Sequence, residues 1–220
     1  MTAPDRSQVK ELIAARVAKE LKDGDFVNLG IGLPTLVPQF LPPDVQVTLQ
    51  AELGIVGMGP RPDEDHLDPY VVGAGGSFAS CVPGGAFIDS MMSFALIRGG
   101  HVDVTVLGAL QVDQEGNLAN WIIPGKLVPG MGGAMDLVVG AKRVIIAMEH
   151  TQKGSPKILK QCTLPLTAMR CVDLIITEMC VLSVEEGGLV LREIADGYTL
   201  DDIKANTEAD FTVELAAVAI

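Results

Sequence analysis

The stretches VTVLGAL at residues 104–110 and RVIIAM at residues 143–148 decide the fold class. Both are almost wholly apolar and rich in β-branched residues, which favour β-structure. A strand with one face in water alternates apolar and polar side chains, whereas these runs are apolar almost without a break. Such runs are typical of parallel strands that are covered on both faces. The two stretches therefore predict the centre of a buried sheet.

Helical and extended patterns alternate on either side of these two strands. Residues 6–22 are predicted to form a helix, because Val9, Leu12, Ile13 and Val17 recur at helical spacing. Shorter helices are predicted at 33–41, 87–100, 134–141 and 199–207. Further strands are predicted at 26–32, 45–50, 102–112, 142–148, 173–179 and, at a sheet edge, 189–195, whereas 60–86 read as loop. The alternation predicts an α/β fold with an open, mostly parallel sheet flanked by helices, in one domain over residues 1–220.

Composition and charge exclude several function classes. The chain has 220 residues, 48% of them hydrophobic, and a net charge of −12. No basic run is long enough to track a phosphate backbone, so we expect no nucleic-acid partner, and the acidity disfavours an anionic membrane. No signal-peptide pattern or apolar run of transmembrane length occurs, so we expect a cytoplasmic protein. The cysteines and histidines lack metal-ligand spacing, so we expect no metal.

Three glycine-bearing segments follow predicted strands, where ligands collect in open α/β sheets. They are NLGIGLPT (28–35), ELGIVGMGP (52–60) and PGKLVPGMGGAMD (124–136). In the third, consecutive glycines before a short helix expose backbone N–H groups, which suits an oxyanion or a phosphate. A tight turn without a ligand is the alternative.

Glu52 is the one charged residue in the stretch LQAELGIVGMGP, residues 49–60. Its neighbours Leu49, Leu53 and Ile55 are apolar. A carboxylate at a strand end in a glycine-lined, partly dry site can act as a base or a nucleophile. The alternative is a solvated or N-capping glutamate.

Longer motifs follow one another between about residues 8 and 205. They are NLGIGLPT, GIVGMGP (54–60), SFALIRGGHVDVTVLGALQVD (93–113), GNLANWIIPGKLVPGMGGAMDLV (116–138), RVIIAMEHTQKG (143–154) and KILKQCTLPLT (157–167). Together they resemble the β subunit of 3-oxoacid CoA-transferases of the acetate/butyrate–acetoacetate type, which belong to the family I CoA-transferases. The resemblance implies a fold shared with some sugar-phosphate isomerases. It also implies ping-pong transfer of CoA between a short-chain acyl-CoA and a carboxylic acid such as acetoacetate.

The resemblance also implies roles for particular residues. Glu52 takes the place of the family's nucleophile, which forms an acyl–glutamyl anhydride and then a glutamyl-CoA thioester. Gly133 is expected to donate its amide to the oxyanion, and Asn120 and Gly132 are expected to contact CoA. Lys126 faces a phosphate or carboxylate, or is a plain surface lysine. Asn28 caps its loop or touches CoA. No cofactor is expected to be bound permanently, because coenzyme A is a substrate.

The family likeness further implies a partner and raises a doubt about activity. Family I enzymes pair this β subunit with an α subunit of similar fold, so we expect an α2β2 heterotetramer with the active site between subunits. The family motif Ser-Glu-Asn-Gly reads Ala51-Glu52-Leu53-Gly54 here. Ala51 lacks a hydroxyl that could orient the carboxylate, and Leu53 makes the vicinity drier. The site is therefore tuned for another acyl group, or the chain is a catalytically impaired CoA-binding or regulatory subunit.

Overall fold

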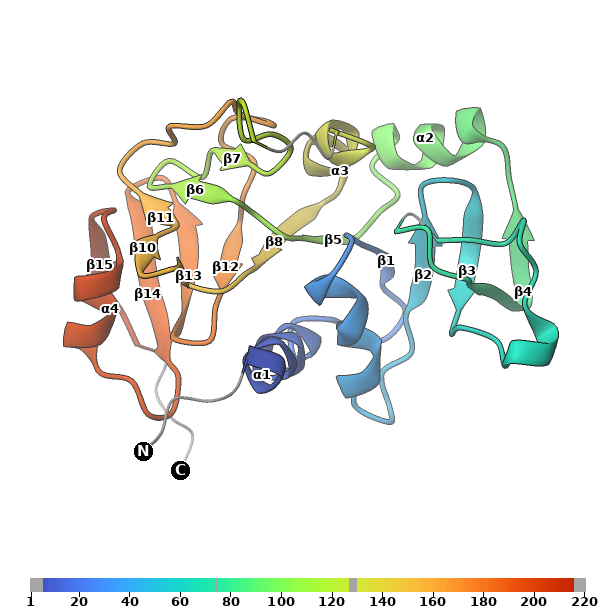
Figure 1. Cartoon of the computed structure of the whole chain (residues 1–220), viewed down its shortest axis with the longest axis horizontal. Coiled ribbons are helices and arrows are strands. Elements are labelled where there is room, and N and C mark those ends of the chain that lie inside the picture. Colours follow the sequence, from blue (N-terminus) through green and yellow to red (C-terminus); the bar gives the residue numbers. More distant parts are fainter. Residues whose placement is uncertain (1–5, 74, 127–129, 216–220) are drawn as a thin grey trace.

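The computed structural model describes residues 6–73, 75–126 and 130–215, with the side chains of residues 6 and 7 left aside. Its centre is a parallel set of five strands, which lie in the order β12-β8-β5-β1-β2 (Figure 1). Their bounds are β1 Phe26–Leu29, β2 Thr48–Ala51, β5 Val104–Leu107, β8 Arg143–Ala147 and β12 Leu174–Ile176. The apolar stretches at residues 104–110 and 143–148 thus supply two adjacent central strands, β5 and β8. The predicted open α/β sheet is confirmed.

Both ends of this sheet are extended by antiparallel hairpins, and the edge strand β15 completes ten strands. Beyond β2 lie β3 (Ile55–Gly59) and β4 (Ser80–Phe87), and beyond β12 lie β13 (Cys180–Glu185) and β14 (Gly188–Ile194). The prediction that residues 189–195 form a sheet edge is wrong, because β15 (Phe211–Val213) pairs in parallel with the outer side of β14. A three-residue strand carries too little pattern to be recognised from sequence.

The glycine-bearing segment after Glu52, for which no strand was predicted, forms β3, and β4 was also missed within residues 60–86. Glycines weaken a strand pattern, but here they permit a close approach of two backbones. Gly57 has φ of +78°, and a methyl group on it would lie 3.0 Å from the Cα atom of Gly85. The register shift between Val56 and Met58 in the β3–β4 pair falls at the same point.

Helices cover both faces of the sheet (Figure 1). On one face lie α1 (Arg6–Ala18) and the 3-10 helix η1 (Leu33–Phe40), and on the other lie α2 (Ser90–Arg98) and α3 (Ala134–Gly140). The remaining elements are η2 Glu64–His66, β6 Gln111–Asp113, β7 Leu118–Ala119, β9 Thr151–Gln152, β10 Ser155–Pro156, β11 Ile158–Leu159 and α4 Leu200–Asn206. The strand predicted at 102–112 is therefore two strands, β5 and β6, which belong to different sheets.

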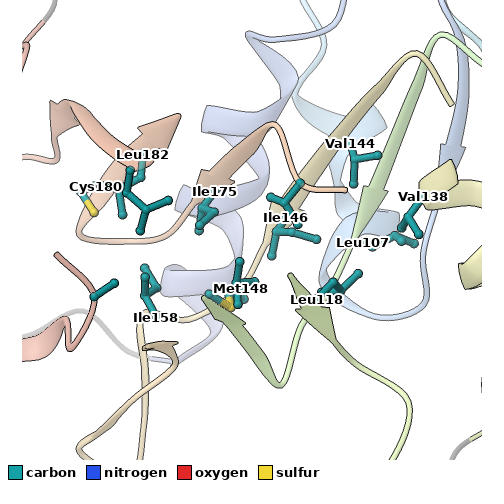
Figure 2. Close-up of a cluster of buried hydrophobic side chains, with 14 of the residues drawn as sticks. Leu107, Leu118, Val138, Val144, Ile146, Met148, Ile158, Ile175, Cys180 and Leu182 are labelled. Atoms are coloured by element: carbon teal, nitrogen blue, oxygen red, sulfur yellow. The ribbon is translucent and has the colours of Figure 1, made fainter. Parts of the chain in front are cut away.

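Most of the core consists of two apolar clusters, one on each face of the central strands. Val104 and Val106 of β5 face α1, whereas Val144 and Ile146 of β8 belong to the cluster under α3 (Figure 2). Alternate residues of each strand point to opposite faces, so an unbroken apolar run is what two covered faces require. Each such buried side chain stabilises the fold by about 1.5–3 kcal/mol.

Candidate active site

Glu52 lies in the turn that joins β2 to β3, at the carboxyl end of β2. The N–H of Gly54 donates to the carbonyl oxygen of Ala51 at 2.9 Å and closes the turn. Gly54 has φ of +123°, and a methyl group on it would overlap the carbonyl oxygen of Ile88. The N–H of Ile88 in turn donates to the Gly54 carbonyl at 2.9 Å. Only glycine fits this position, so the turn holds Glu52 at a defined place.

Tertiary packing brings Glu52 against Gly133, the N-cap residue of α3. A methyl group on Gly133 would lie 3.1 Å from Cγ of Glu52 and 3.5 Å from Cζ of Phe94. Helices α2 and α3 pack against each other on the side of the sheet where the β2–β3 turn lies (Figure 1). The two residues that the family likeness selected for catalysis are therefore in contact distance.

The backbone amides of Gly132 and Gly133 are the candidate oxyanion donors of the glycine turn. Within the described part of the chain, no acceptor takes a hydrogen bond from either N–H group. Gly133 is buried and Gly132 is exposed, and Gly132 adopts a positive φ of +53°. An N–H group without a partner beside the stem of a carboxylate can stabilise an oxyanion that forms on that carboxylate.

Three buried polar side chains lie beneath the Glu52 turn. The Nδ2 group of Asn28 donates to Oε1 of Gln50 at 3.2 Å, and Nε2 of Gln50 donates to Oγ of Ser93 at 2.9 Å. The Ser93 hydroxyl then donates to the backbone carbonyl oxygen of Glu52 at 2.8 Å. Sequence reasoning singled out Asn28 but missed Gln50 and Ser93. The sequence feature that could have revealed Gln50 is a glutamine at a strand position that needs burial, directly before the Glu52 turn.

The side chain of Asn120 is held by the protein's own hydrogen bonds. Its Nδ2 group donates to the carbonyl oxygen of Gly108 at 3.2 Å, and its Oδ1 atom accepts from the Thr167 hydroxyl at 2.6 Å. Its backbone N–H donates to the same hydroxyl at 3.2 Å. Asn120 therefore ties the loop after β5 to the Thr167 segment. Its predicted contact with CoA stays a prediction.

Lys126 is exposed, and its backbone N–H donates to the carbonyl oxygen of Ile123 at 3.0 Å. Its ammonium group makes no ion pair within 4.0 Å with a carboxylate among the residues described. Residues 127–129, which link it to the glycine turn, lie outside the described residues. Both interpretations of this lysine, a ligand contact and a surface residue, stay open.

The two departures from the family motif lie on different sides of the turn. Ala51 is buried, and its methyl group packs in a small apolar cluster with Ile55 and Ala79. Leu53 is exposed, with 59% of its surface accessible. The Leu53 side chain is therefore largely accessible to solvent in the isolated chain. The Glu52 backbone is held from beneath by Ser93 rather than by residue 51.

His150 is a buried structural residue away from this turn. Its Nδ1 and Nε2 atoms lie 2.9 Å from the hydroxyls of Thr177 and Thr207. Burial, with a smaller contribution from the Lys157 charge, lowers the pKa of His150 to about 4. The ring is therefore neutral at physiological pH.

The described residues contain no group of three or more His, Cys, Asp or Glu side chains arranged to hold a metal ion. In that same part of the chain, no helix has the length and apolar character needed to cross a bilayer.

Comparison with known proteins identifies the family. A family model described as Coenzyme A transferase matches residues 10–206. The chain is 57% identical over 205 residues to the acetate CoA-transferase subunit beta of Escherichia coli K12, covering 93% of this chain and 94% of that one. It is 51% identical over 212 residues to the mouse mitochondrial succinyl-CoA:3-ketoacid coenzyme A transferase 2B, covering 95% of this chain but 41% of that one.

A solved structure shares the fold. The apoenzyme of the acyl-CoA transferase YdiF from Escherichia coli O157:H7 superimposes with a TM-score of 0.76 at 23% identity, over 98% of this chain and 44% of that one. At that identity the likeness concerns the fold alone. The family match and the bacterial relative each cover nearly all of the sequence. The chain belongs to the coenzyme A transferase family.

Proposed function

We propose that this chain is the β subunit of a CoA-transferase that moves CoA between a short-chain acyl-CoA and a carboxylic acid such as acetoacetate. The observation that carries the proposal is the contact between Glu52 and Gly133, whose amide has no acceptor among the described residues. The names of the bacterial and mouse relatives support an acetate or 3-ketoacid substrate.

In the proposed reaction, the Glu52 carboxylate attacks the thioester carbonyl of the donor. The tetrahedral intermediate expels the CoA thiolate, which leaves an acyl–glutamyl anhydride. The thiolate then attacks the glutamyl carbonyl, and the donor acid leaves as its carboxylate. The product is a glutamyl-CoA thioester, and the acceptor carboxylate runs the same steps in reverse. Water would hydrolyse both intermediates, so the assembled site must exclude it.

A carboxylate is a poor nucleophile towards a thioester, so positioning and charge stabilisation must supply the catalysis. An oxyanion develops in each tetrahedral intermediate, and the Gly133 amide, with Gly132 beside it, is our proposed donor. One donor of this kind contributes about 3–4 kcal/mol of transition-state stabilisation. Binding energy from the distant parts of CoA lowers the barrier further at the sulfur atom.

We propose Asn120 and Lys126 as contacts for CoA, which is a substrate, with no permanently bound cofactor and no metal. Asn120 sits rigidly at the carboxyl edge of the sheet, where open α/β folds bind ligands. Lys126 offers an exposed charge for a phosphate or carboxylate. For Asn28 burial favours the structural role over a contact with CoA.

We further propose an α subunit as the partner, in an α2β2 heterotetramer in the cytoplasm. The relatives named subunit beta support such a partner. The apolar side chains of Met91 and Met92 on α2, Met135 and Val139 on α3, and Leu53 beside Glu52 are exposed. An exposed apolar surface around a site is typical of an interface with another subunit.

The test uses the co-expressed α–β complex. Acyl-CoA should produce a borohydride-sensitive glutamyl thioester, located at Glu52 by mass spectrometry, and a panel of donor and acceptor acids should define the substrates. Glu52→Gln should abolish both the adduct and transfer. If the wild-type complex binds acyl-CoA but forms no adduct, the alternative holds instead. The chain is then a catalytically impaired, regulatory subunit, as Ala51 and Leu53 suggest.

A further inference from the structure

The hydrogen-bonded row beneath Glu52 lies where apolar residues would normally pack. Asn28 and Gln50 are registered neighbours on β1 and β2, and each is 1% exposed. Ser93 reaches the row from α2 and is fully buried. Polar groups in such a place add little net stability even when they are paired, and they cost stability when they are not. The Oδ1 atom of Asn28 is buried without a partner among the described residues.

The direction of the hydrogen bonds in this row is determined by the backbone. The Nδ2 group of Asn28 lies 3.2 Å from the backbone carbonyl oxygen of Gln50 as well as 3.2 Å from its Oε1 atom. A backbone carbonyl can only accept, so the Asn28 nitrogen must face Gln50. The Gln50 oxygen therefore faces Asn28, and its nitrogen donates to Ser93. The single hydroxyl proton of Ser93 is then left for the Glu52 carbonyl.

We propose that Ser93 and Gln50 are positioning residues for Glu52, which hold its backbone carbonyl by a directed hydrogen bond and so place its carboxylate beside Gly133. The proposal rests on the proposed function, in which Glu52 is the nucleophile. It assigns the orienting role, which the family likeness attributes to residue 51, to a hydroxyl on a different element.

Helix α2 connects the two catalytic residues physically. Ser93 binds the Glu52 carbonyl, and Phe94, the next residue, lies against Gly133. Adjacent residues of one helix therefore contact both the nucleophile and the oxyanion donor. Catalytic geometry must hold within about half an ångström, and a misplacement of about 1 Å can cost about a hundredfold in rate. Loss of the Ser93 hydrogen bond should release the turn at its Glu52 side, while the bonds at Gly54 remain.

The decisive variant is Ser93→Ala in the α–β complex. Alanine removes the hydroxyl from a helical position that it tolerates well. We expect the glutamyl-CoA adduct to form about 10- to 100-fold more slowly in a single turnover, whereas the dissociation constant for acyl-CoA changes less than about threefold. Gln50→Met should likewise slow adduct formation while leaving the dissociation constant for acyl-CoA nearly unchanged, because it removes the amide group that donates to the Ser93 hydroxyl.

Thr105→Val is the matched control. Thr105 is the registered neighbour of Asn28 on β5, it is fully buried, and its hydroxyl has no partner among the described residues. The control therefore removes a buried hydroxyl from the same sheet face without removing a hydrogen bond of the row, and its adduct rate should equal that of the wild type.

Three results would overturn the inference or its basis, and they can be distinguished. An unchanged adduct rate in Ser93→Ala and Gln50→Met refutes the positioning role and leaves Glu52 as the nucleophile. An equal loss in Thr105→Val shows a general effect of core substitution and also refutes it. Absence of any adduct in the wild-type complex refutes the proposed function itself.

Discussion

Substitution of Gly133 by alanine tests the contact on which the site depends. Gly133 has φ of −83° and ψ of 4°, a conformation that alanine adopts without strain. The new methyl group would lie 3.1 Å from Cγ of Glu52, whereas two carbon atoms in contact prefer about 3.5–4.0 Å. The Glu52 side chain must therefore move by about half an ångström, and Phe94, at 3.5 Å, limits relief on the other side.

The expected result is a slower enzyme with little change in stability. If about 1 Å of misplacement costs about a hundredfold, half of it costs about tenfold in kcat. The gain of about 0.4–1 kcal/mol from replacing glycine by alanine is offset by the crowding of Glu52 and by the poorer N-cap of α3, so the free energy of unfolding should change by less than about 1 kcal/mol. Both quantities are measured on the α–β complex, by a CoA-transfer assay and by thermal unfolding.

Gly187→Ala is the matched control, because a methyl group there would meet no atom within 4 Å and its φ is not positive. Its transfer rate should equal that of the wild type. Wild-type kcat in Gly133→Ala would refute the claim that Glu52 and Gly133 act in contact.

Three further predictions follow from the same geometry. Gly54→Ala should reduce stability by about 1–3 kcal/mol and lower transfer strongly, because the methyl group overlaps the Ile88 carbonyl at a φ of +123°; urea unfolding and kcat measure both effects. Burial lowers the pKa of His150 to about 4, against 6.5 for an exposed histidine, so its contribution to stability is complete above pH 6.5 and about 3 kcal/mol is lost as the pH falls from 6.5 to 4. The loss should be absent from urea titrations of His150→Gln. Leu53→Asn should change the free energy of unfolding of the isolated subunit by less than about 0.5 kcal/mol, because Leu53 is exposed, and a larger change in thermal unfolding would contradict that placement.

Local pattern was sufficient for the central strands and for singling out Glu52 as a candidate. The apolar runs at 104–107 and 143–147 could only be satisfied by a sheet covered on both faces, and they form β5 and β8. Glu52 was recognisable because a single carboxylate stood at a strand end beside glycines, and the family motif agreed with it. These features depend on neighbouring residues alone, so they can be read along the chain.

Tertiary structure decided which distant residues serve that carboxylate. Gly133 reaches Glu52 because α2 and α3 pack side by side, and Ser93 reaches its carbonyl because α2 covers β2. Ser93 does not differ locally from an ordinary helix residue, and Gln50 shows only that a polar residue occupies a strand position that needs burial. Tertiary structure also decided the place of the short β15, which pairs with β14 and so puts β14 inside the sheet rather than at its edge. Hydrophobic periodicity specifies which face of an element is buried, but hydrogen bonds between elements depend on how those faces meet in space.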